Sequence, residues 1–243
     1  MAGGKSVSPD LWRATYIIRT ALARGGCTST AVGERVILTA AHCVRNGALG
    51  EISRPDGGTP VLVECDHHEG YAADKLPPQE KNKSKDFALC YVEEPLRGFP
   101  FERLATSLAD GREGDSIRLL GYGCTEAGQF DPDFGVLFSF QPAIVERQPA
   151  SGDVDLNTTT RAKGVLCAGD SGGAAYVDKD VNGRRVIIGV NSRAEENVSF
   201  FSTTTTEAFF LWARRWMDKK KKQKNTNVHI CGLSSAADGC RSN

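Results

Sequence analysis

The sequence has no excess of charge of either sign: its 243 residues include 30 lysines and arginines against 30 aspartates and glutamates. A protein that binds nucleic acid usually carries a clustered excess of basic residues, so we expect no nucleic-acid partner. The sequence also lacks any run of about 20 apolar residues, the length that a helix needs to cross a bilayer. This absence predicts that the chain has no membrane span.

Two further absences concern export and cysteine use. The first residues, Met1 to Lys5, contain no apolar run of the kind that a secretory leader needs. None of the eight cysteines belongs to a CxxC pair, which argues against a zinc ribbon or a thioredoxin-like site. An even number of scattered cysteines instead favours disulfides and an oxidising compartment. We therefore expect a secreted protein, extracellular or periplasmic, whose leader is absent from this chain; the alternative is a cytosolic protein with free thiols.

Most of the chain consists of short apolar segments separated by Gly, Pro, Asn and Asp. Such segments, without helical alternation, are typical of a closed all-β barrel or a sandwich. The clearest predicted strands are 15–19, 35–39, 61–65, 87–91, 116–120, 136–140, 174–177 and 185–191. The longer polar segments are predicted to be surface loops, namely 46–60, 70–85, 126–134 and 150–163.

One helix is predicted near the end of the chain, over about 206–220. Thr206 suits an N-cap, and Phe209, Trp212 and Trp216 follow at helical spacing. A periodic apolar face of this kind usually packs on a core, here the β-structure. The lysines at 219–222 lie where cations suit the helix dipole, and we expect them to be solvated.

Three segments contain residues that could carry out catalysis. His42 follows an apolar strand and precedes Cys43, so its ring would be held firmly enough to move protons at neutral pH. Asp86 leads into another apolar strand, where a carboxylate needs a partner such as an imidazole N–H. Each residue alone has an ordinary alternative role, since many histidines satisfy a local hydrogen bond and many aspartates cap a turn.

The third segment is Cys-Ala-Gly-Asp-Ser-Gly-Gly, which ends at Gly173. Glycines on both sides of Ser171 permit a sharp turn that exposes its hydroxyl and directs nearby N–H groups toward one point. A glycine-rich turn with an incidental serine is the alternative interpretation.

Together, the motifs TAAHC, DFAL and GDSGG resemble those around the catalytic triad of the trypsin/chymotrypsin family. The order His, Asp, Ser also matches that family, whereas subtilisins and α/β-hydrolases use other orders. The resemblance implies a serine endopeptidase with His42, Asp86 and Ser171 as the triad and with the N–H groups of Gly169 and Ser171 as the oxyanion hole. These roles are carried over from the family.

The resemblance also implies a fold and an organisation for the whole chain. We expect an all-β protein with two six-stranded antiparallel β-barrels (chymotrypsin-like), the active site between them, and a C-terminal α-helix. Residues 1–243 would form one peptidase domain: a first barrel at about 15–105, a second at about 115–205, the helix at about 206–220 and a disulfide-closed tail at 221–243. We expect a monomer that acts on polypeptide substrates, with a protein inhibitor as a further potential partner. We expect no cofactor and no metal. For calcium in particular, the loop after Cys43 has no acidic cage.

Eight cysteines allow on the order of a hundred pairings, so the sequence alone does not choose among them. The resemblance implies the pair Cys27–Cys43. Proximity along the chain suggests Cys231–Cys240. The remaining two pairs, Cys65–Cys90 and Cys124–Cys167, follow as hypotheses. The last pair departs from the family pattern, because Cys167 has no cysteine after Ser192 with which to pair.

The resemblance also indicates a specificity pocket. Val165 stands six residues before the nucleophile, where trypsin-like enzymes that cleave after Lys or Arg have an aspartate. With Val165 as its floor, Leu166 beside it and Ala194 on its wall, the pocket should favour apolar or small P1 side chains. Ser192 is expected to help hold Asp86, and the backbone of residues 192–194 to pair with the substrate. Arg193 replaces a common aromatic residue.

Family members usually pair a newly formed N-terminal ammonium with the aspartate that precedes the nucleophile. Here that aspartate is Asp170, and Met1-Ala-Gly-Gly resembles such an N-terminus. The sequence leaves two partners open for Asp170, namely the Met1 amine and another cation. For the whole protein, the alternatives are a catalytically inert homologue that binds a partner, and an esterase or other acyl transferase on the same fold.

Overall fold

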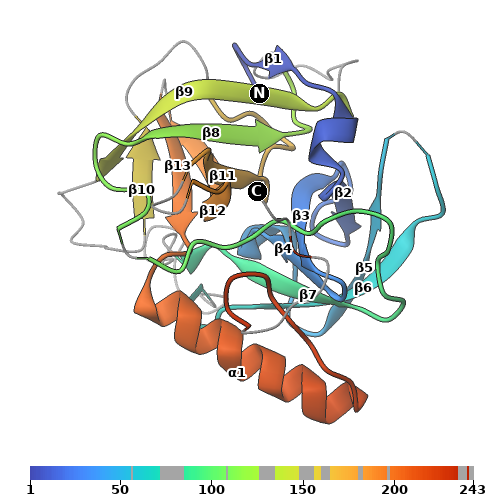
Figure 1. Cartoon of the computed structure of the whole chain (residues 1–243). Coiled ribbons are helices and arrows are strands. Elements are labelled where there is room, and N and C mark those ends of the chain that lie inside the picture. Colours follow the sequence, from blue (N-terminus) through green and yellow to red (C-terminus); the bar gives the residue numbers. More distant parts are fainter. Residues whose placement is uncertain are drawn as a thin grey trace.

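The computed structural model describes residues 1–55, 57–71, 85–107, 109–125, 135–147, 156–159, 165–179, 183–195, 198–234 and 240. The described part of the chain is mainly β-structure, with strands in two groups and one long helix (Figure 1). The predicted loop 126–134 and most of 70–85 lie outside the described residues.

The first group of strands forms a closed barrel in the order β2-β3-β4-β7-β6-β5. All neighbouring pairs are antiparallel, and the pairing of β2 with β5 closes the ring. The strands are β2 (Thr15–Thr20), β3 (Cys27–Gly33), β4 (Val36–Thr39), β5 (Ala48–Ser53), β6 (Val61–His67) and β7 (Ala88–Val92). Every residue of β3, β4 and β7 is buried, because other parts of the protein cover the outside of these strands as well as the inside.

The second group forms a seven-stranded sheet in the order β1-β9-β10-β13-β12-β11-β8. An additional pairing of β9 with β8 joins the two sides, so that six strands make a barrel-like ring and β1 adds to β9. The strands are β1 (Lys5–Ser6), β8 (Ser116–Gly121), β9 (Phe138–Arg147), β10 (Leu156–Thr159), β11 (Ala174–Val177), β12 (Val186–Glu195) and β13 (Val198–Thr203). The predicted chymotrypsin-like fold is confirmed, with β1 as an extra strand.

Several strands were not predicted from the sequence. The segment 46–60, predicted to be a loop, contains β5, and 150–163, also predicted to be a loop, contains β10. The strands β3 and β13 were missed because serine and threonine interrupt their apolar character. In β3 these hydroxyl groups lie in the interior, and two of them are hydrogen-bonded there: Ser29 donates to the Tyr16 carbonyl and Thr28 to the Gly169 carbonyl. A polar composition therefore did not mean an exposed loop.

The predicted C-terminal helix is confirmed as α1 (Glu207–Lys224), which ends four residues later than expected. The Thr206 side chain caps it by accepting a hydrogen bond from the Phe209 N–H. Phe209 and Trp212 pack against Phe87 beside β7, which places α1 on the first barrel (Figure 1). Three 3-10 helices complete the described elements: η1 (Pro9–Trp12), η2 (Ala41–Cys43) and η3 (Glu69–Tyr71). Among the described residues, no helix is both long enough and apolar enough to cross a membrane.

The expectation that the lysines at 219–222 are all solvated was wrong. Lys220 is fully buried, and its Nζ lies 2.6 Å from Glu64 Oε1 and 3.0 Å from Asp66 Oδ2. Lys219 also reaches Asp66, at 3.2 Å. The acidic residues belong to β6, so this face of α1 is held to the first barrel by ion pairs as well as by aromatic packing.

The eight cysteines form four disulfides, and the structure has no free cysteine among the residues it describes. The pairs are Cys27–Cys43, Cys65–Cys90, Cys124–Cys167 and Cys231–Cys240. Cys65 and Cys90 are direct partners in the register of β6 and β7. Cys124–Cys167 joins two segments of the second barrel and lies next to the candidate active site.

Candidate active site

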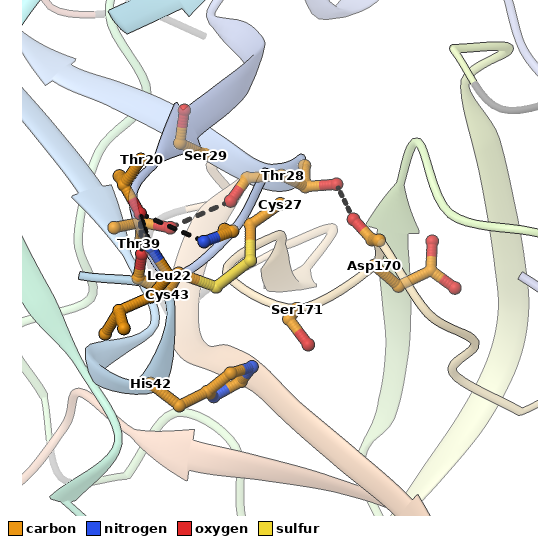
Figure 2. Close-up of a disulfide and its surroundings, with 12 residues drawn as sticks. Thr20, Leu22, Cys27, Thr28, Ser29, Thr39, His42, Cys43, Asp170 and Ser171 are labelled. Carbon is orange, nitrogen blue, oxygen red and sulfur yellow. Dashed lines mark hydrogen bonds between the residues drawn. A yellow bond between two sulfur atoms is a disulfide. The ribbon is translucent and has the colours of Figure 1, made fainter. Parts of the chain in front are cut away.

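His42 lies in η2, directly after β4 and beside the Cys27–Cys43 disulfide (Figure 2). Its backbone N–H donates to Asp86 Oδ1 at 2.9 Å, and its ring Nδ1 lies 2.7 Å from Asp86 Oδ2. This double contact fixes both the position and the orientation of the imidazole. With Nδ1 as the donor to Asp86, Nε2 is the nitrogen left free to accept a proton.

Asp86 precedes β7 and is only 2% exposed. Besides the two contacts with His42, Oδ2 accepts a hydrogen bond from Ser192 Oγ at 2.6 Å. The backbone N–H of Asp86 donates to Ser202 Oγ at 3.1 Å. The first barrel therefore supplies the carboxylate, and β12 and β13 of the second barrel hold it in place. Nothing in the sequence pointed to Ser202, because serines are common in strands.

The charge of Asp86 affects the titration of His42. Burial lowers the pKa of the His42 imidazole, but the Asp86 carboxylate raises it through its charge and its hydrogen bond. The cationic side chain of Arg193 opposes Asp86 and lowers the pKa. The net result is a pKa above the ordinary value of 6.5.

Ser171 lies in a tight turn that faces His42 across the site (Figure 2). Gly172 has a φ of 85°, and a Cβ there would lie 2.2 Å from both the Thr28 carbonyl and Thr39 Oγ1. This position therefore requires glycine. Ser171 Oγ donates to the Ser192 carbonyl at 3.4 Å, and no hydrogen bond joins it to His42 among the contacts of the described residues. In unliganded active sites, catalytic hydrogen bonds are often long and tighten when substrate binds.

The residues before Ser171 form a chain of turns. The N–H of Asp170 donates to the Cys167 carbonyl and that of Gly173 to the Asp170 carbonyl, both at 3.0 Å. Gly169 has a φ of 95°, and its carbonyl accepts a hydrogen bond from Thr28 Oγ1 at 2.7 Å. Within the described part of the chain, the N–H groups of Gly169 and Ser171 have no protein acceptor. Both groups are therefore available to an external oxygen.

Asp170 is completely buried and lies 3.1 Å from the Met1 ammonium. Its carboxylate also accepts hydrogen bonds from the N–H groups of Gly123, at 2.9 Å, and Cys167, at 2.8 Å. Burial raises the pKa of Asp170, while the ammonium and these N–H groups favour its ionised form. The Met1 ammonium donates in addition to the carbonyls of Gly123 and Cys124.

The residues predicted to form the specificity pocket lie on two adjoining segments. Val165 is half-buried and forms an antiparallel bridge with Ala2. Leu166 is buried, and its N–H donates to Ser199 Oγ at 3.0 Å. Ala194 is opposite Ser199 in the register of β12 and β13. The neighbouring residues 160–164 lie outside the described part of the chain.

Arg193 has partners that the sequence did not reveal. Its guanidinium carbon lies 4.3 Å from the centroid of the Phe200 ring, and its Nε is 3.3 Å from Glu195 Oε1. In the described residues, β11 pairs with β12 only up to Val190, whereas β13 pairs with the other side of β12 as far as Glu195. The segment from Ser192 onward is therefore an edge to which another strand could add.

One group of potential metal ligands occurs in the described residues: Cys27, His42 and Cys43, whose ligand atoms lie within 4.8 Å of one another. Both sulfur atoms are joined in a disulfide. A metal needs the thiolate form of cysteine, so this group does not suit a metal ion.

The chain therefore has the fold of a chymotrypsin-like hydrolase, with a histidine–aspartate pair and a serine brought to one site. A family model described as Trypsin matches residues 2–208. The protein belongs to the trypsin family. The comparison with curated proteins gave no match.

Proposed function

We propose that the protein is a serine endopeptidase with Ser171 as the nucleophile, His42 as the general base and Asp86 as the residue that orients His42. The observation that carries this proposal is the buried Asp86 carboxylate, which accepts hydrogen bonds from His42 Nδ1 at 2.7 Å and from Ser192 Oγ at 2.6 Å. A carboxylate held in this way fixes the tautomer that a general base needs. The free N–H groups of Gly169 and Ser171 support the same conclusion.

The proposed reaction is acyl transfer in two stages. Ser171 Oγ attacks the scissile carbonyl as its proton passes to His42 Nε2, and the negative charge on the carbonyl oxygen is stabilised by the N–H groups of Gly169 and Ser171. The C–N bond then breaks, and His42 gives the proton to the leaving amine. In the second stage, His42 takes a proton from water, the hydroxide attacks the acyl-enzyme, and the proton returns to Ser171.

A fluorophosphonate probe tests this proposal against its alternatives. Ser171 is expected to take up one equivalent, which mass mapping of the labelled peptide would locate. A protein that takes up no label would be an inert homologue, which would contradict the proposal. A labelled protein that cleaves activated esters but no peptides would instead be an esterase.

We also propose that the pocket over Val165 and Leu166 accepts apolar or small P1 side chains. An apolar floor gives a cationic side chain no counter-ion, so cleavage after Lys or Arg should be poor. Digestion of a peptide library, with fluorophosphonate-inactivated protein as the blank, is expected to show apolar or small residues at P1. A digest with mostly Lys or Arg at P1 would refute this prediction.

The pH profile should report the protonation of His42. Because the base must be neutral to accept a proton, kcat/KM should rise with pH and level off above the pKa of His42, which is higher than 6.5. Arg193→Gln removes a cation that lowers this pKa, so its profile should move to higher pH, while Arg193→Lys should move it less. An inflection at or below 6.5, or identical profiles for the native protein and Arg193→Gln, would contradict the assignment.

The remaining proposals concern the bounds of the domain, its oligomeric state and the compartment in which it works. We propose that residues 1–243 form one peptidase domain, and that the protein works as a monomer on polypeptides outside the cytoplasm. Four disulfides support an oxidising compartment.

A further inference from the structure

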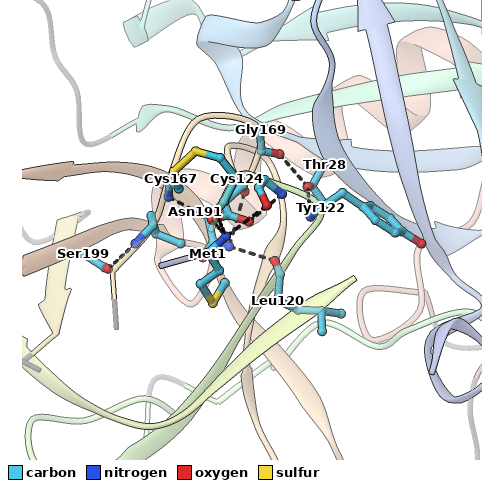
Figure 3. A network of polar contacts seen from close by, with 12 residues as sticks. Met1, Thr28, Leu120, Tyr122, Cys124, Cys167, Gly169, Asn191 and Ser199 are labelled. Atoms are coloured by element: carbon cyan, nitrogen blue, oxygen red, sulfur yellow. Dashed lines mark hydrogen bonds and ion pairs between the residues drawn. A yellow bond between two sulfur atoms is a disulfide. The ribbon is translucent and has the colours of Figure 1, made fainter. Parts of the chain in front are cut away.

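The Cys124–Cys167 disulfide joins two segments that meet behind the turn of Ser171. Cys124 stands three residues after the end of β8, and Cys167 stands three residues before Asp170. Figure 3 shows the disulfide next to Gly169 and above the Met1 ammonium. The bridge lies directly beside the backbone that carries the two free N–H groups of the site.

The two segments also touch through their backbones. The N–H of Cys124 donates to the Ala168 carbonyl at 3.0 Å. A Cβ at Gly123 would lie 2.5 Å from the Asp170 nitrogen and 2.7 Å from the Ala168 carbonyl oxygen. No side chain fits between the segments, so the position of one fixes the position of the other.

The same segments enclose Asp170. Gly123 and Cys167 donate their N–H groups to the two oxygens of its carboxylate. The carbonyls of Gly123 and Cys124 accept from the Met1 ammonium. The described polar partners of the Asp170 carboxylate are therefore of two kinds. Gly123 and Cys167 belong to the segments that the disulfide joins, and the Met1 ammonium is hydrogen-bonded to one of these segments.

We propose that the Cys124–Cys167 disulfide is a positioning element of the catalytic site, which holds the turn of Gly169 and Ser171 in the arrangement that binds an oxyanion. This inference rests on the proposed function. Without the disulfide, the turn is held to the Gly123 segment by hydrogen bonds and one ion pair, which can open locally. The disulfide keeps the Cα atoms of Cys124 and Cys167 at 5.4 Å, so opened contacts would re-form in the same place.

The test compares two double variants of the full chain. Cys124→Ala/Cys167→Ala removes the proposed positioning element, and Cys231→Ala/Cys240→Ala is the matched control. Cys231 makes its described backbone contacts with Val32, Leu104 and the local tail, and none with the site. Loss of correct positioning in an active site can cost about 100-fold. We expect kcat to fall by about 100-fold in the first variant with KM changed much less, and to stay within about 3-fold of native in the control.

Two measurements distinguish a failure of the proposed function from a failure of the positioning role: activity towards p-nitrophenyl acetate and the burst of acylation. If the native protein shows neither a burst nor fluorophosphonate labelling, the proposed function fails. If the native protein is active and Cys124→Ala/Cys167→Ala keeps its kcat within about 3-fold, the positioning role is refuted. An equal loss of kcat in the control variant would also refute it, because the effect would then be one of general stability.

A second measurement avoids dependence on the folding of a variant. Native protein is partly reduced and alkylated, and mass mapping counts how often each disulfide has opened. Residual kcat is expected to fall with the opening of Cys124–Cys167 and not with that of Cys231–Cys240. The opposite correlation would overturn the inference.

Discussion

Ser171→Ala is expected to lower kcat by about 10⁶-fold, the scale of loss when the nucleophile of a catalytic triad is removed. The variant has no oxygen to attack the carbonyl, while the backbone N–H groups and the pocket residues stay in place. KM should therefore change little. The fold should also be kept, because the described hydrogen bond from Ser171 Oγ to the Ser192 carbonyl is long, at 3.4 Å.

The measurement is steady-state hydrolysis of a peptide substrate selected from the library, with fluorophosphonate labelling in parallel. Ser53→Ala is the matched control, since Ser53 is also half-buried and its hydroxyl has one described partner, Arg19. That control should keep kcat within about 3-fold. If Ser171→Ala retained native activity, another residue would be the nucleophile and the proposed triad would be wrong.

Asp170→Asn is expected to lower the free energy of unfolding by about 3 kcal/mol, because it leaves the Met1 ammonium buried without a counter-ion. Both partners of this ion pair are completely buried. The Asn amide would also place a donor where the carboxylate now accepts from the N–H of Gly123 or Cys167. Since Asp170 adjoins Ser171 and Gly169, we expect a loss of kcat in the same variant.

Asp178→Asn is the matched control for this substitution. Asp178 accepts from Arg118, at 3.0 Å, and from Gln141 Nε2, at 2.5 Å, but its side chain is 37% exposed. Water screens exposed pairs, whose contribution is about 0 to 1 kcal/mol. Chemical denaturation of the two variants should therefore give clearly different losses of stability. Equal losses would mean that the buried pair with Met1 contributes no more than a surface pair.

The sequence was sufficient where a short segment carries its own signal. Thr206 and the aromatic residues that follow it at helical spacing predicted α1, and the structure confirmed this helix. The motifs around His42, Asp86 and Ser171, in that order, predicted the family that the comparison identified. These features depend on neighbouring residues and on the chemistry of the side chains themselves, and both can be read without a fold.

Features that depend on contacts between residues far apart in the chain became visible only in the fold. The strand β5 has little apolar character, and it forms because β2 and β6 pair with it on both sides. Lys220 is buried because α1 lies over Glu64 and Asp66, which are more than 150 residues away in sequence. The sequence shows which of these residues are charged or apolar, but it does not show which distant residues they contact.

The candidate active site also has features that the sequence predicts and features that appear only in the fold. The residue types and the turn-forming glycines around Ser171 can be read directly from the amino-acid sequence. Only the tertiary structure brought Ser192 and Ser202 to Asp86, set Arg193 over Phe200, and closed Cys124 onto Cys167 beside the buried Asp170. Antiparallel barrels are built from contacts between distant segments, and packing of the whole chain selects among such contacts.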